Sequence, residues 1–419
     1  MPCETIRPPG SASMPAPASS PVSSPAFAPA FAPAAAPAVR GTATASPAGG
    51  GAAGAGTRPL RAQPTDPIHD EPSSLALFLG PLALLLDDPG VTEICINQPG
   101  SAFVERQSGW TCEVLPFATY EWCVSIAKLV ANFTRQRISA NEPLLSATLP
   151  GGERIQIVLP PATEERTVSI TIRRPSSVLW TLDELDELGV FEPTRPLPAV
   201  APQAHPASAS VPVPPLSAAD RELVDLLAER RFVAFLRRAV QLRKNILLSG
   251  ATGSGKTTLS KALILEVPAD DRLVTIEDVK ELSLHNQPNH VRLFYSQGAQ
   301  GQAGVTPGQL LASAKRQRPD RVFVSELRTG DEVYDYLVSV NTGHPGSITS
   351  VHADSAQMAF VALAQLMKRS EAGQGMTTRE GIELAQLSVD VVVQCARDRQ
   401  RRVVREIWFD PLNRHRLLA

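Results

Sequence analysis

Residues Asn245–Thr258, NILLSGATGSGKTT, decide the fold of this chain. The apolar run Ile246–Leu248 predicts a buried strand, and the periodic run Leu259–Val267 predicts a helix. Between them lies the loop GATGSGKT, which has the spacing GxxxxGK(S/T). Strand, glycine loop and helix in this order predict a phosphate-binding loop, because the glycines let backbone N–H groups turn toward an anion at the positive end of the helix. The alternative is a glycine-rich turn that only precedes a helix.

The loop predicts that the chain binds a nucleoside triphosphate, with ATP and Mg²⁺ as the expected cofactors. Lys256 is expected to reach the β- and γ-phosphates, and the Thr257 hydroxyl is expected to be a Mg²⁺ ligand. The predicted nucleotide-binding residues of the loop are Gly250, Ala251, Thr252, Gly253, Ser254, Gly255, Lys256, Thr257 and Thr258.

Length and composition limit the class of protein. The chain has 419 residues and a net charge of −2, so it has room for more than one domain and no global charge that favours nucleic acid or an anionic membrane. Its 5 cysteines are scattered without a C-x-x-C pair, which favours a reducing compartment. We therefore expect a cytoplasmic protein.

A membrane span is not expected. The longest apolar run, Leu75–Leu86, is interrupted by Gly80-Pro81. A spanning helix needs about 20 apolar residues, so this run predicts a core helix instead. No basic segment followed by an apolar core opens the chain, which argues against export. Any membrane contact is expected to be peripheral.

Composition divides the chain into four segments. Residues 1–67 consist largely of Ala, Pro, Ser, Gly and Thr, which predicts a disordered tail. Residues 68–190 alternate short strands with an amphipathic helix over Glu121–Arg135, which predicts a small α+β domain. Residues 191–216 are rich in proline and predict a semi-extended spacer. Residues 217–419 alternate helices and strands, which predicts an α/β domain with a mostly parallel sheet.

Acidic residues follow the second predicted strand of the α/β domain. Thr275-Ile276-Glu277-Asp278 ends this strand, and Glu281 follows. Ligands bind at the carboxyl ends of parallel strands, so Glu277 is predicted to contact the nucleotide or its metal, and carboxylates at this strand end are suited to hold Mg²⁺ or to orient the attacking water. The alternative is a capped loop whose acids are solvated.

A third apolar strand, Val322–Ser325, delivers Glu326 at its carboxyl end. This arrangement has the shape of a Walker B motif, so Glu326 is predicted to be catalytic and to hold Mg²⁺ through a water molecule. Arg328 follows two residues later and is predicted to face the same phosphates.

Two histidines flank the next predicted strand. His344 lies in NTGHPGS and His352 in VHAD, and both are predicted to lie near the nucleotide. Neither has further ligands at zinc spacing, so a zinc cluster is not expected. A histidine held in the core is the alternative for each.

Together these motifs resemble those of the traffic ATPases of bacterial secretion, and the resemblance extends from about Ile68 to the C-terminus. GATGSGKTT resembles their Walker A motif, TIEDVKEL their acidic box, FVSELR their Walker B motif and NTGHPGSITSVHADS their histidine box. The phrases GGERIQIVLPP and LLASAKRQRPDRVFVSELRTGDEVYDYL resemble the type IV secretion branch more than the type II or pilus-motor branch.

The resemblance implies a homohexameric ring of RecA-like α/β domains, each with a separate N-terminal domain across the nucleotide. It implies catalytic roles for Arg154 and Arg173 of the N-terminal domain and for Arg318 of the α/β domain. It also implies that Glu281 is the catalytic acid of the acidic box. Guanidinium groups suit this role because they stay charged and bind phosphate oxygens in a fork.

The resemblance also implies the partners and the task. We expect an ATP-hydrolysing motor that contacts inner-membrane secretion-channel proteins at the cytoplasmic face, with nucleic acid only as a possible transported substrate. Three alternatives stay open: a type II secretion or pilus-assembly ATPase, a DNA-translocating helicase on the same core, and a slowly hydrolysing assembly scaffold.

Overall fold

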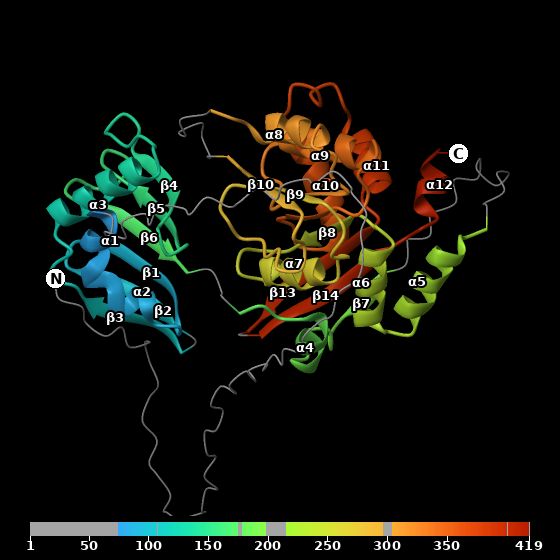
Figure 1. Cartoon of the computed structure of the whole chain (residues 1–419), viewed down its shortest axis with the longest axis horizontal. Helices are drawn as coiled ribbons and strands as arrows, with labels where there is room; N and C mark the ends of the chain where they lie inside the picture. The colour runs from blue at the N-terminus through green and yellow to red at the C-terminus, as the bar shows by residue number, and fades with distance from the viewer. Residues whose placement is uncertain are drawn as a thin grey trace, which may run out of the picture. The chain divides into compact units, whose positions relative to one another are not determined.

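The structure is a computed structural model that describes residues 74–106, 108–174, 178–197, 215–295, 304–399 and 401–418. The predicted tail, residues 1–67, and residues 198–214 of the predicted spacer lie outside these ranges. Mixed helices and strands over the rest confirm the α/β fold class (Figure 1).

The N-terminal part is built on a 6-stranded antiparallel sheet of order β3-β2-β1-β6-β5-β4 (Figure 1). Its strands are β1 (Val91–Gln98), β2 (Ser101–Arg106), β3 (Gly109–Val114), β4 (Leu144–Thr148), β5 (Arg154–Val158) and β6 (Ser169–Arg173). Its helical segments are α1 (Ser74–Leu79), the 3₁₀ turn η1 (Gly80–Leu82), α2 (Ala83–Asp87) and α3 (Tyr120–Phe133).

The apolar run Leu75–Leu86, which was predicted to form a core helix, is divided into α1, η1 and α2. The division lies at Gly80-Pro81, where the 3₁₀ turn begins with proline in its first positions.

One face of this sheet is buried and the other carries two arginines. Ile155 and Ile172 are register partners on β5 and β6, and both are buried in the N-terminal core. Their neighbours Arg154 and Arg173 are also register partners. Because successive side chains of a strand point to opposite faces, both arginines lie side by side on the face away from this core.

The C-terminal part contains two adjacent groups of strands, β10-β9-β11 and β12-β8-β13-β14-β7. Their bounds are β7 (Arg195–Leu197), β8 (Ile246–Ser249), β9 (Leu273–Glu277), β10 (His290–Phe294), β11 (Arg321–Val324), β12 (Ile348–Val351), β13 (Val391–Asp398) and β14 (Arg401–Phe409). Every pair is parallel except β13 with β14.

Side-chain hydrogen bonds join the two groups along β11 and β12. Ser347 Oγ donates to the carbonyl of Val322 at 2.6 Å, and Ser350 Oγ donates to the carbonyl of Ser325 at 3.0 Å. The strand β12 thus lies between β8, which precedes the glycine loop, and β11, which precedes Glu326.

Helices cover the parallel strands (Figure 1). They are α4 (Leu182–Glu187), α5 (Ala218–Ala228), α6 (Phe232–Gln241), α7 (Lys256–Leu265), α8 (Pro307–Lys315), α9 (Gly330–Asn341), α10 (Ala356–Met367), α11 (Thr378–Ser388) and α12 (Asn413–Leu418). Arg230 adopts a φ of 58° and separates α5 from α6. Its guanidinium donates to the carbonyl of Thr194 at 2.7 Å, which holds this break in place.

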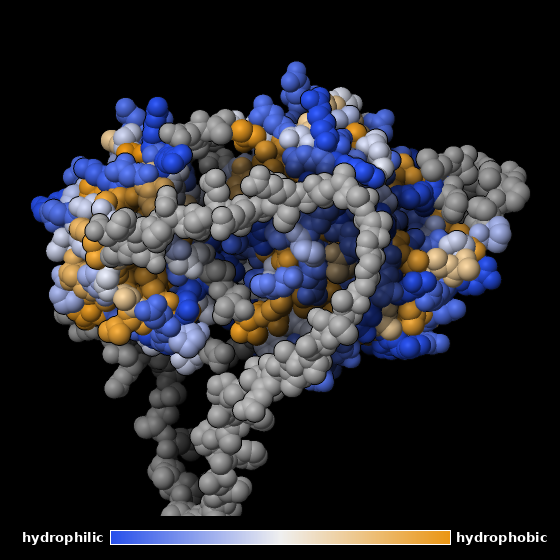
Figure 2. All heavy atoms as spheres, in the orientation of Figure 1, coloured by the Kyte–Doolittle hydropathy of each residue, from blue (hydrophilic) through white to orange (hydrophobic). Residues whose placement is uncertain are grey.

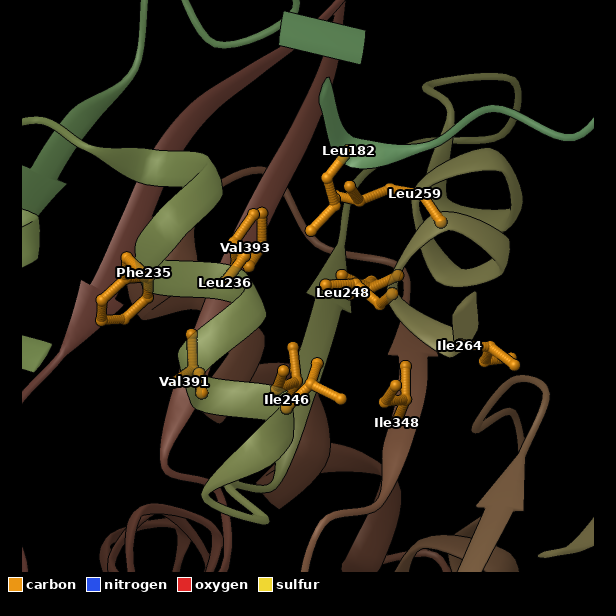
Figure 3. Packing of buried hydrophobic residues seen from close by; sticks show 14 of the residues in the cluster. Leu182, Phe235, Leu236, Ile246, Leu248, Leu259, Ile264, Ile348, Val391 and Val393 are labelled. Carbon is orange, nitrogen blue, oxygen red and sulfur yellow. The ribbon is translucent and has the colours of Figure 1, made fainter. Parts of the chain in front are cut away.

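Strand β8 lies at the centre of the C-terminal core. All of its residues are buried, and Ile246 and Leu248 belong to one apolar cluster while Leu247 belongs to the cluster on the other face. Figure 3 shows Leu248 beside Leu259 of α7 and near Leu236 of α6. A strand covered on both faces is continuously apolar, which is why this short run was recognisable in the sequence.

The first seven residues of the predicted spacer, 191–197, lie within the described C-terminal part. Phe191 is 2% exposed and belongs to the same apolar cluster as Leu182 of α4 and Phe235 of α6. Residues Arg195–Leu197 form β7, which pairs with β14. The start of the proline-rich stretch is thus part of the C-terminal core.

Apolar side chains also reach the surface of the N-terminal part. Leu77, Leu84 and Val114 are 66%, 88% and 70% exposed, and Figure 2 shows apolar residues on the visible face of this part. Among the described helices, none has both the length and the apolar character needed to cross a membrane.

The buried pair Arg321–Asp271 fixes the amino ends of the central strands. Arg321 is 1% exposed and its Nε donates to Asp271 Oδ2 at 2.7 Å, while Arg243 Nη2 donates to Asp271 Oδ1 at 2.7 Å. Arg321 also donates to the carbonyl of Val240 at 2.8 Å. This guanidinium therefore joins β11 to the end of α6.

Replacing Asp271 by Ala is expected to lower the free energy of unfolding by about 3–5 kcal/mol, because it leaves Arg321 buried without a counter-charge. Denaturant titration followed by circular dichroism measures this change. As a control, Asp183→Ala removes one of the two acidic partners of Arg237 at a site where the Asp183 side chain is 64% exposed, and should cost about 1 kcal/mol or less. Equal losses in the two variants would contradict a structural role for the buried pair.

Candidate active site

The glycine loop between β8 and α7 has the backbone geometry of an anion cradle. Gly250, Gly253 and Gly255 adopt φ values of 147°, 75° and 101°, a region that side chains disfavour. A Cβ at Gly250 would lie 2.3 Å from the carbonyl oxygen of Cys395 on β13. The loop leads directly into the N-terminus of α7, whose free N–H groups favour an anion.

Lys256 bridges this loop from the first turn of α7. Its ammonium group donates to the carbonyl oxygens of Gly250 at 2.7 Å and Ala251 at 3.2 Å, and lies 3.3 Å from His352 Nδ1. Burial lowers the pKa of Lys256, while the charge of Glu326 acts in the opposite direction. The cation is therefore held in the loop by weak neutral acceptors, which a phosphate would replace with stronger ones.

The loop after β9 carries two carboxylates that face the N-terminal sheet. Arg154 Nη2 of β5 lies 2.8 Å from Glu281 Oε1 and 3.6 Å from Asp278 Oδ1. Arg154 Nη2 is thus held by ion pairs, while Arg154 Nε is buried and has no hydrogen-bond acceptor among the described residues. The charge of the neighbouring Arg173 also acts on Glu281 and Lys256.

Burial raises the pKa of Glu281, and the charge of Arg154 opposes this effect. Its side chain is 20% exposed. A carboxylate with a raised pKa is a stronger base than an ordinary glutamate, which suits it to accept a proton or to orient a water molecule.

Glu326 lies at the carboxyl end of β11 between two cations and a histidine. Arg328 Nε donates to Glu326 Oε2 at 2.7 Å, and Arg328 Nη1 is also bonded to Asp278. His352 Nε2 lies 2.7 Å from Glu326 Oε1, while its Nδ1 lies 3.1 Å from the carbonyl of Gly250. His352 therefore links the acid after β11 to the glycine loop after β8.

The structure places Glu277 differently from the prediction that it contacts the nucleotide. Its side chain is fully buried, and both oxygens accept hydrogen bonds from within the protein. Successive residues of a strand point to opposite sides, so Asp278 faces the charged cluster and Glu277 faces inward.

Two other predicted residues lie away from this cluster in the same chain. His344 precedes β12 and Arg318 precedes β11, so both lie beyond the amino ends of strands whose carboxyl ends carry His352 and Glu326. The same amino edge contains a cavity of about 330 Å³ lined by residues such as Lys244, Asn245, Pro345 and Asp390. This cavity takes no part in the charged cluster around Lys256.

Two further loop residues flank Lys256. Thr257 is exposed in the first turn of α7, and Ser254 is buried with its hydroxyl unbonded among the described residues. Together with the unbonded Arg154 Nε and the glycine geometry, these groups have the chemistry to hold a triphosphate.

Comparison with known proteins agrees with this geometry. Residues 217–406 match the family model described as Type II/IV secretion system protein. The chain is 44% identical over 354 residues to "Type IV secretion system protein VirB11" of Bartonella henselae, covering 84% of this chain and 98% of that protein.

The chain belongs to the VirB11 family of type IV secretion system proteins. A crystal structure of the VirB11 ATPase from the Brucella suis type IV secretion system in complex with sulphate is 41% identical, has a TM-score of 0.46 and matches 82% of this chain and 99% of that chain. The structure of the pilus retraction motor PilT with bound ADP is 16% identical, has a TM-score of 0.50 and matches 83% of this chain and 87% of that chain.

Membership of the VirB11 family confirms the resemblance to type IV secretion ATPases, and the likeness to PilT confirms the RecA-like fold. The identities favour the type IV branch over the pilus-motor alternative.

Replacing Gly250 by Ala is expected to weaken ATP binding at least about 10-fold, because the new Cβ would collide with the Cys395 carbonyl and displace the loop. Equilibrium binding of a fluorescent ATP analogue measures this change. The matched control is Gly253→Ala, where nothing lies within 4 Å of the new Cβ and only the positive φ opposes the substitution. Equal binding by Gly250→Ala and the wild-type protein would exclude this steric explanation.

Proposed function

We propose that this VirB11-family chain hydrolyses ATP with Mg²⁺ as a homohexamer at the cytoplasmic face of the inner membrane. It would power the assembly of, or substrate transfer through, a type IV secretion system. The observation that carries the proposal is the convergence of Lys256, Glu326, Glu281 and Arg154 from separate elements on one edge of the parallel strands.

Binding of ATP would use the glycine loop and α7. The N–H groups of residues 250–258 would surround the β-phosphate, and Lys256 would exchange the carbonyls of Gly250 and Ala251 for phosphate oxygens. The Thr257 hydroxyl would hold Mg²⁺ directly and Glu326 would hold it through a water molecule. When bound, this cation neutralises charge on the β- and γ-phosphates.

Hydrolysis would depend on carboxylates that already lie at the correct edge. Glu281 would orient the attacking water and accept its proton, because burial makes it more basic than an exposed glutamate. Glu326 would contribute to the Mg²⁺ coordination shell through water. His352 contacts both Glu326 and the carbonyl of Gly250, so it would couple the position of Glu326 to the glycine loop. Arg328 would keep Glu326 and Asp278 together through the reaction.

Arginines of the N-terminal sheet would stabilise the charge that develops on the γ-phosphate. Arg154 already touches Glu281, and Arg173 is its cross-strand neighbour. Guanidinium groups supplied to a transferring phosphoryl group accelerate hydrolysis by transition-state charge stabilisation. In this proposal Arg318, at the opposite strand end, and His344 would reach a phosphate only from a neighbouring subunit.

Coupling to secretion would follow from this division of the site between two sheets. The glycine loop belongs to the parallel strands and Arg154 belongs to the antiparallel sheet. Binding and loss of the γ-phosphate would change how strongly the two parts attract each other. The resulting movement would be transmitted to channel proteins at the membrane, with protein, pilus subunits or nucleic acid as transported substrate.

Replacing Lys256 by Gln is expected to reduce ATP turnover to background and to abolish secretion, because the ammonium charge on the β- and γ-phosphates is lost. Phosphate release by the purified protein and complementation of a deletion strain measure the two effects. Lys368→Gln, an exposed lysine at the end of α10, is the control for the loss of a lysine. Undiminished turnover by Lys256→Gln would refute the assignment.

Replacing Arg154 by Gln is expected to move the acid limb of the kcat–pH profile to higher pH. Burial raises the pKa of Glu281 and Arg154 opposes this, so removing Arg154 raises that pKa further. The active carboxylate is then lost at a higher pH as the solution is acidified. Arg137→Gln, an exposed arginine in the same part of the chain, should leave the limb in place. An unchanged limb in Arg154→Gln would exclude Glu281 as the titrating base.

A further inference from the structure

Glu277 is a fully buried carboxylate at the end of β9 that the proposed reaction does not use. Its Oε1 accepts a hydrogen bond from Thr275 Oγ at 2.7 Å. Its Oε2 accepts hydrogen bonds from two consecutive backbone N–H groups, those of Glu281 at 2.8 Å and Leu282 at 2.9 Å. Burying an ionised group is unfavourable unless its oxygens are satisfied, and these contacts satisfy them.

The two backbone bonds close the turn that carries the catalytic acid. Glu277 and Glu281 are four residues apart, and the side chain of the first holds the backbone N–H of the second. The intervening Asp278 is turned to the opposite side, where it meets Arg154 and Arg328. Glu277 therefore sets the position of the Glu281 backbone without touching the charged cluster.

Arg292 on the neighbouring strand β10 holds the same turn from the other side. Its Nη2 donates to the carbonyl of Leu282, and its Nη1 lies 3.6 Å from Glu277 Oε1. Leu282 is thus fixed through its N–H by Glu277 and through its carbonyl by Arg292. The turn after β9 has little freedom to move while this ion pair is intact.

Glu332 performs the same function for the other acidic loop. Its Oε2 accepts hydrogen bonds from the N–H groups of Arg328 at 2.9 Å and Thr329 at 3.2 Å, and Tyr295 Oη donates to its Oε1 at 3.2 Å. Glu332 is 1% exposed. The loops after β9 and β11 are therefore each held by a buried glutamate that accepts two consecutive N–H groups.

We propose that Glu277 is a positioning residue that acts on hydrolysis through Glu281. The proposal rests on the proposed function in one respect, which is that Glu281 orients the attacking water. Loss of the Glu277 oxygens would release the Glu281 backbone, and a displacement of about 1 Å at a catalytic group can reduce turnover by about 10²-fold. The glycine loop and Lys256 make no contact with Glu277, so ATP binding should be retained.

The test is a double-mutant cycle between Glu277→Ala and Glu281→Gln, with kcat and KM measured for ATP. Glu281→Gln alone should reduce kcat about 10²-fold or more. Glu277→Ala alone should reduce kcat by about 10²-fold with KM changed less than about 3-fold. In the Glu281→Gln background, Glu277→Ala should cause almost no further loss, because the group that it positions is already gone.

Two further variants separate positioning from folding. Glu277→Gln keeps an oxygen for both N–H groups and should retain kcat within about 10-fold of wild type. Glu277→Asp is one methylene shorter, cannot reach both N–H groups and should resemble Glu277→Ala. Glu380→Ala is the matched control, because Glu380 accepts hydrogen bonds from Thr377 in the exposed capping box of α11, away from this turn.

The possible outcomes are distinct. A folded Glu277→Ala protein with wild-type kcat, or equal fractional losses in both backgrounds of the cycle, would overturn the positioning role. A fall in ATP affinity that matches the fall in kcat would also overturn it. Should Glu281→Gln itself retain wild-type turnover, the proposed role of Glu281 would fail first and this inference with it. Should Glu277→Ala not fold, the kcat of Glu277→Gln is compared with that of Glu277→Asp. Equal kcat values in these two variants would overturn the positioning role.

Discussion

The site depends on keeping three carboxylates together at one edge of a sheet. Asp278, Glu281 and Glu326 carry like charges that would repel one another without cations between them. Arg154 contacts the first two, and Arg328 contacts Asp278 and Glu326. The arrangement is stable only as a whole, because removing one cation leaves buried negative charge uncompensated. A triphosphate entering this cluster would compete with the carboxylates for the same cations.

Much of this site was predictable because phosphate chemistry constrains local sequence. The strand, the glycine loop and the helix follow one another without interruption, so their spacing alone places Lys256 and Thr257. Acids after β9 and β11 were predictable because carboxyl ends of parallel strands meet at one edge. The same rule places His344 and Arg318 at the opposite edge of the same chain, since both precede the strands that deliver His352 and Glu326.

What the sequence could not show was the direction of individual side chains. Glu277 and Asp278 are adjacent acids, and only the phase of the β9 pleat decides which one turns inward. The short strand β7 was also missed, because Pro196 and its neighbours resemble a spacer. Proline has no N–H to donate. It is tolerated in β7 because this strand is the last in its group among the described residues, so one of its edges pairs with no described strand.

Arg154 and Arg173 lie on one pair of strands, β5 and β6. This placement bears on how hydrolysis could move the N-terminal part. A hydrogen bond to a charged group contributes about 1.5–3 kcal/mol. Moving a two-state equilibrium from 1:99 to 99:1 requires about 5.5 kcal/mol of differential binding. Because both arginines lie on the same face of β5 and β6, they would gain or lose a γ-phosphate together. Their combined bonds are of the size needed to move the N-terminal sheet as a unit, whereas either arginine alone would only bias its position.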